Sequence, residues 1–163
     1  MVVYNELVAL TAGAGLLGFA AFLAHLIKDK RIDSEGWAGF FAVTGVLLLA
    51  LGIHTTVTWP FGGNGFEYAN IAFGQPAAGF GALLLFAAVY LWRQRSLYAG
   101  AVEEANATTL AAFKPVGIFV GALGLGMAVL AITFVRFQLG AAPPEERQGE
   151  LFLQNATHSV LIP

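Results

Sequence analysis

Four long stretches without Asp, Glu, Lys or Arg constrain this chain more than any other feature of its sequence. They cover residues 7–27, 37–59, 71–92 and 115–135. Each has about the 20 residues that a helix rising 1.5 Å per residue needs to cross roughly 30 Å of hydrocarbon. Because lipid offers the backbone no hydrogen-bond partner, such stretches fold as helices. The sequence therefore predicts an all-α membrane protein, a bundle of four transmembrane helices.

The composition supports the same class. Of the 163 residues, 58% are hydrophobic and 11% are charged, against about 25% charged in soluble domains. The net charge is −2 and no basic stripe is present, which argues against nucleic acid as a partner. The absence of Cys excludes thiolate catalysis, disulfides and Cys-ligated metals. We predict one membrane domain, residues 1–163, with a more polar tail over residues 140–163.

The basic residues predict the orientation of the chain. Residues 28–36 and 93–114 connect the predicted helices, and the connection 60–70 has no Lys or Arg. The two basic connections contain Lys28, Lys30, Arg31, Arg93, Arg95 and Lys114. The positive-inside rule then places residues 28–36 and 93–114 in the cytoplasm and both termini outside.

Prolines and small residues give finer expectations. Pro76 and Pro115 are predicted near helix starts, where a missing N–H costs nothing. Small residues recur at a spacing of four, as in Gly117 and Gly121. This spacing allows close approach of helix backbones. We expect packing within one bundle, and leave association with other membrane subunits or with a second copy open.

Polar side chains are predicted to gather at the outer end of the bundle. The candidates for a binding or structural cluster are Glu6, Trp59, Glu67, Asn70 and Arg136. A charge at membrane depth costs roughly 2.5–3.5 kcal/mol, so Arg136 should pair with Glu6 or Glu67 or reach water. A structural salt bridge is one interpretation, and a site for an anion, a lipid head group or a metal is the other.

His54 is the candidate for binding a cofactor. His25 and His54 fall at opposite ends of the predicted bundle, so they cannot be the two axial ligands of one haem. A haem or a quinone near His54 stays open, although a helix-end histidine bonded to water or a carbonyl explains the residue as well. A metal site made of Glu6, His54, Glu67 and His158 lacks short ligand spacing, and none is predicted.

The connection after the second stretch carries a family resemblance. It contains Thr58-Trp59-Pro60, then Asn70-Ile71 and Phe73-Gly74-x-Pro76 leading into a membrane helix. This pattern resembles an uncharacterised family of four-helix bacterial and archaeal membrane proteins, a domain of unknown function. The resemblance implies the four-helix fold and an important loop. We expect the membrane to be a prokaryotic plasma membrane. It implies no activity.

No complete catalytic motif is present, so we expect a non-catalytic accessory or structural subunit of a larger membrane complex. One alternative is a membrane redox protein binding haem or quinone near His54. The other is a small-solute transporter or channel that acts as an oligomer. A transporter needs polar residues near the membrane midplane, whereas only Thr11 and Thr44 interrupt the apolar helix interiors.

Overall fold

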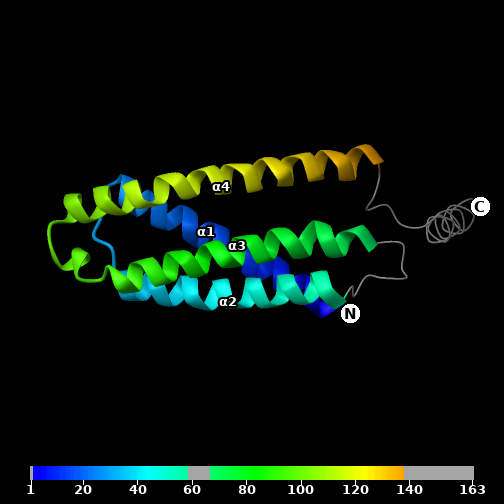
Figure 1. Ribbon diagram of the computed structural model, residues 1–163, viewed down its shortest axis with the longest axis horizontal. Helices are drawn as coiled ribbons and strands as arrows, with labels where there is room; N and C mark the ends of the chain where they lie inside the picture. Colours follow the sequence, from blue (N-terminus) through cyan, green and yellow to red (C-terminus); the bar gives the residue numbers. More distant parts are fainter. Residues whose placement is uncertain (1, 59–66, 138–163) are drawn as a thin grey trace, which may run out of the picture. The chain divides into compact units, whose positions relative to one another are not determined.

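The computed structural model describes residues 2–58 and 67–137, which form long helices joined by short connections (Figure 1). In chain order these are α1 (Val2–Ile27), α2 (Ser34–Thr58), α3 (Glu67–Arg93), the short 3₁₀ helix η1 (Leu97–Ala99) and α4 (Val102–Phe137). The described residues contain no strand. The predicted all-α architecture with four long helices is confirmed, and each helix is long and apolar enough to cross a membrane.

The prolines do not mark helix starts. Pro76 and Pro115 both lie inside helices, because α3 begins at Glu67 and α4 at Val102. The expectation that these prolines stand near helix starts was therefore wrong. Each proline removes one N–H, which leaves a single carbonyl without its usual donor, and the helix continues past it.

The connection between α1 and α2 is tight because both helix ends are capped. After α1, the N–H of Lys30 donates to the carbonyl of His25 at 3.0 Å, and the N–H of Asp29 donates to that of Leu26 at 3.3 Å. Asp29 has φ 46°, in the left-handed region. These features form a Schellman motif, which normally places Gly at this position. At the start of α2, Asp33 Oδ1 accepts the N–H of Gly36 at 3.2 Å and caps the helix.

α2 and α3 run side by side and share the most extensive interface among the described helices (Figure 1). Glycines allow this contact, at positions seven apart in each helix. A Cβ on Gly52 would lie 2.7 Å from the carbonyl oxygen of Gly74, and one on Gly45 would lie 3.0 Å from that of Gly81. A Cβ on Gly74 would lie 2.9 Å from the carbonyl oxygen of Gly52, and one on Gly81 would lie 2.9 Å from that of Gly45. We call these four residues the glycine clasp, because nothing larger than hydrogen fits between the two backbones.

Aromatic side chains from all the long helices fill the core near the η1 end. Phe22 of α1 meets Phe41 of α2 edge to face, with ring centroids 5.4 Å apart. Phe113 of α4 lies against Phe22 at 6.0 Å and against Tyr90 of α3 at 5.4 Å. Phe113 is 5% exposed. This one side chain therefore joins α4 to both α1 and α3.

Residues up to Met127 form one compact unit, and residues from Ala128 onward form a second. The described part of the second unit is the end of α4. Its Thr133 hydroxyl donates to the carbonyl of Val129 at 2.9 Å, and Arg136 is exposed in the last turn.

Candidate functional site

Some of the residues predicted to form the outer cluster lie at one end of the first unit. The amino ends of α1 and α3 and the carboxyl end of α2 lie at this end (Figure 1). Glu6 and His54 are exposed there, and Asn70 is fully buried. His54 and Asn70 each take part in an interaction with a neighbouring group.

The remaining members of the predicted outer cluster are not placed against Glu6 and Asn70. Trp59 lies outside the described residues, Glu67 begins α3 without a described side chain, and Arg136 belongs to the second unit. The outer cluster therefore stays a prediction. Within residues 6–58 and 70–136, no three His, Asp or Glu side chains gather closely enough to hold a metal ion. The predicted absence of a metal site likewise stays a prediction, since Glu67 and His158 fall outside those ranges.

The buried threonines are satisfied by their own helices. Thr11 donates its hydroxyl hydrogen to the carbonyl of Leu7 at 2.7 Å, and Thr55 donates to that of Leu51 at 2.8 Å. Thr44 donates to the carbonyl of Phe40 at 2.8 Å. Each hydroxyl thus returns its hydrogen to the helix backbone, which lowers its availability for a solute.

At the opposite end of the unit, two buried hydroxyls meet. The Tyr98 and Thr109 oxygens are 2.6 Å apart, and Thr109 also donates to the carbonyl of Ala105 at 2.8 Å. A threonine hydroxyl has one hydrogen, so Tyr98 is the donor to Thr109. Burial raises the pKa of the Tyr98 phenol, and the hydrogen bond with Thr109 partly opposes that shift.

Asn106 joins the start of α4 to the segment that follows α1. Its amide Nδ2 donates to the carbonyl of Lys30 at 3.2 Å, and the residue is 2% exposed. Its Oδ1 is buried without a hydrogen-bond partner in the described structure. Sequence reasoning missed this residue. The available signal was the helical spacing of Asn106 with Thr109 and Phe113, which together form the buried face of α4.

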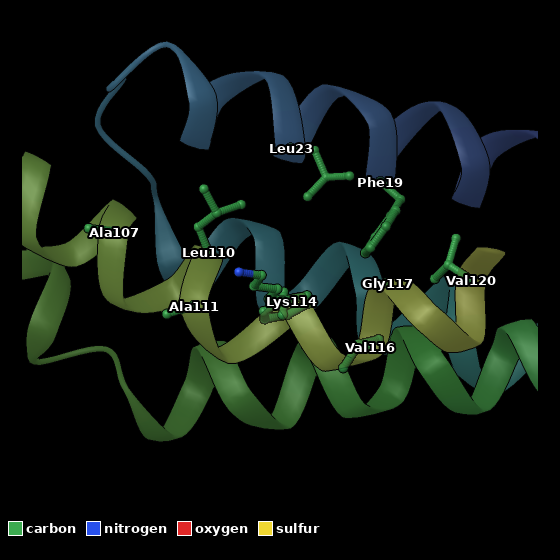
Figure 2. Close-up of a pocket in the computed structure, with 10 residues that line it drawn as sticks. Phe19, Leu23, Ala107, Leu110, Ala111, Lys114, Val116, Gly117 and Val120 are labelled. Carbon is green, nitrogen blue, oxygen red and sulfur yellow. The ribbon is translucent and has the colours of Figure 1, made fainter.

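An apolar groove runs between α1 and α4 (Figure 2). Phe19 and Leu23 line it from α1, and one face of α4 lines it from Ala107 to Val120. Its volume is about 660 Å³, within the range of roughly 300–1,000 Å³ typical of small-molecule sites. Lys114 is the single charged residue that lines it in the part of the chain that the structure describes. We call this feature the Lys114 groove.

Comparison with known proteins gives a family match over the whole chain. The family described as protein of unknown function (DUF981) matches residues 1–163. No curated protein and no solved structure gives a significant match. The match confirms the resemblance to an uncharacterised family, and it carries no activity and no site residues.

Proposed function

This chain belongs to the DUF981 family, and from that premise we propose that it is a non-catalytic integral membrane protein that serves as an accessory or structural subunit of a larger membrane complex. α4 is the helix that contacts the rest of that complex. The partner surface is a transmembrane helix of another subunit or of a second copy of this chain.

The contrast between two sets of glycines carries this proposal. The glycine clasp packs inside the protein, whereas a Cβ on Gly117, Gly121 or Gly124 of α4 would meet nothing within 4 Å among the described residues. No residue from Lys114 to Met127 is buried. Exposed glycines destabilise a helix by roughly 0.5–1 kcal/mol each relative to Ala. Small residues on one helix face are useful where a second backbone approaches closely, and we call Gly121 and Gly124, which do not line the Lys114 groove, the assembly face.

A native mass measurement tests the proposal. After gentle solubilisation, we expect a particle heavier than one 17.2 kDa chain. Gly121→Leu should release the single chain, since the side chain blocks backbone approach on the assembly face. Gly39→Leu is the matched control, because Gly39 is an exposed glycine of α2 that also has nothing within 4 Å. A wild-type protein that is monomeric, with no co-purifying subunit, contradicts the proposal.

The proposed orientation has both termini outside a prokaryotic plasma membrane and residues 28–36 and 93–114 on its cytoplasmic side, with Lys114 at the membrane end of the second segment. The positions of the basic residues support it. The chain has no Cys, so single cysteines report sidedness without background. Thr58→Cys should react with a membrane-impermeant maleimide in intact cells, and Ser96→Cys only after lysis. The reverse pattern contradicts the orientation.

The two alternatives have no specific observation in their favour among the described residues. A redox role needs a haem or a quinone near His54, which is exposed on α2. A transporter needs polar groups free to meet a solute, whereas Thr11 and Thr44 donate to their own helices. An absorption spectrum of the purified protein distinguishes the haem alternative, since a Soret band supports haem and contradicts a purely structural subunit.

A further inference from the structure

We infer that the Lys114 groove binds one acyl chain of an anionic phospholipid, and that the Lys114 amino group pairs with its phosphate. The inference rests on membrane insertion, which is part of the proposed function, but it does not depend on the assembly face.

The shape of the groove fits an alkyl chain. Its α4 wall runs from Ala107 to Val120, a rise of about 20 Å along a helix. Small residues of that wall, including Ala111 and Gly117, leave the space open between the helices. The rest of the lining is almost wholly apolar, so the groove favours a long, narrow hydrocarbon over a polar solute.

The depth of Lys114 makes its charge significant. Asn106 is bonded to Lys30, just beyond the end of α1. Lys114 follows Asn106 by two turns, about 12 Å along α4. It therefore lines the groove beside the apolar span of α1, with Phe19 and Leu23, and not beside the connection that follows α1. A lysine at this depth is stabilised when its amino group reaches the interface or meets an anion.

The direction of the Lys114 side chain allows its amino group both to reach the interface and to meet an anion there. Figure 2 shows the Lys114 amino group turned back toward Leu110, which is toward the amino end of α4. Leu110 and Ala107 continue the groove in that direction. A phospholipid phosphate at the η1 end of the protein would meet the amino group there, while its acyl chain extends past Gly117 along the groove.

The charge pattern argues for an anionic lipid over a neutral one. No Asp or Glu of the described residues lines the groove, so within that part of the chain Lys114 has no acidic neighbour in the groove. A single lysine near an anionic membrane surface contributes about 1 kcal/mol of attraction. A zwitterionic lipid brings its own ammonium group, which competes with Lys114 for the phosphate.

Lipid retention measured by native mass spectrometry tests the inference. The purified protein is incubated with phosphatidylglycerol or with phosphatidylcholine of the same acyl chains. We expect one tightly held phosphatidylglycerol per chain and weaker retention of phosphatidylcholine. Lys114→Gln should weaken phosphatidylglycerol retention about fivefold and leave phosphatidylcholine unchanged. Lys28→Gln is the matched control, because Lys28 is exposed at the same end and does not line the groove.

A second variant tests the acyl chain separately. Ala111→Phe fills the groove at an exposed position of α4 and should lower retention of both lipids without changing the far-UV circular dichroism. Equal retention of the two lipids by the wild-type protein overturns the inference, as does an equal effect of Lys114→Gln and Lys28→Gln. A second copy of the chain that occupies the groove in place of lipid also overturns it. If the proposed assembly is wrong, the wild-type protein instead has a monomeric mass, and Gly121→Leu does not change that mass.

Discussion

Gly52 and Gly74 face each other so closely that a Cβ on either residue would lie within 3 Å of the other's carbonyl oxygen, at 2.7 and 2.9 Å. Real Cβ atoms do not sit this close to backbone oxygen. The contact involves backbone on both sides, so neither helix can relieve it by rotating a side chain. The pair therefore fixes how near α2 and α3 approach each other.

We expect Gly52→Ala to lower the free energy of unfolding by about 1–3 kcal/mol, the usual effect of overpacking a tight interface. Gly39→Ala is the matched control in the same helix, since its Cβ would meet no atom of residues 2–58 and 67–137 within 4 Å. That control should be neutral or stabilising by up to about 1 kcal/mol. Denaturant titration in one detergent, followed by far-UV circular dichroism, measures both. Equal effects of the two substitutions would show that the clasp does not limit helix approach.

Phe113 should control the attachment of α4. Its ring contacts aromatic rings of α1 and α3, so Phe113→Ala should lower the free energy of unfolding by about 3–5 kcal/mol. Hydrogen exchange in α4 should rise by more than exchange in α2 and α3. Ile118→Ala provides the comparison, because Ile118 is 78% exposed and its truncation opens no cavity. If exchange rises uniformly in all helices, Phe113 is not the specific anchor of α4.

Asp29 occupies a position that favours glycine. With φ 46° at the end of α1, a residue with a Cβ is strained, and Gly removes that strain. Asp29→Gly should raise the free energy of unfolding by roughly 0.5–1 kcal/mol. Asp33→Ala should lower it by about 1 kcal/mol, because it removes the cap on Gly36. Thermal unfolding of both variants checks the opposite signs. Destabilisation by Asp29→Gly would show that the Asp29 side chain contributes more than its backbone strain.

The sequence predicts the helices well, because an uncharged stretch of about 20 residues has few alternatives to a helix that crosses a membrane. It predicts the helix starts poorly. Pro115 suggests a boundary, yet α4 begins at Val102. The residues between them are less apolar than the span, but their buried face contains Asn106 and Phe113. Packing against the other helices therefore extends α4 beyond the limits that hydropathy indicates.

The glycine clasp shows a different limit. The spacing of seven from Gly45 to Gly52, and from Gly74 to Gly81, is visible in the sequence. Which glycine faces which depends on the register between two antiparallel helices, and spacing within each helix does not set that register. The sequence likewise does not show which residues of the candidate site are buried. Asn70 is buried while Glu6 is exposed, and residue type alone does not distinguish these outcomes.

The hydrogen bond from Tyr98 to Thr109 should stabilise the connection between α3 and α4. Removing it in Tyr98→Phe or in Thr109→Val should lower the free energy of unfolding by about 0.5–1.5 kcal/mol at pH 7. If the two hydroxyls act on each other, the double variant should lose less than the two single losses combined. If the two single losses of unfolding free energy add up in the double variant, the 2.6 Å contact between the two hydroxyls contributes nothing to stability.

The same bond predicts a dependence on pH. Burial raises the pKa of Tyr98 in the folded protein above its ordinary value of 10.0, so the unfolded chain loses this proton first as pH rises. The contribution of Tyr98 to stability is therefore fully present below pH 10 and decreases above it. Tyr98→Phe cannot ionise, so the difference in stability between wild type and this variant should shrink above pH 10. Denaturant titrations of both proteins from pH 7 to 11 measure that difference. A constant difference across the range would contradict the raised pKa.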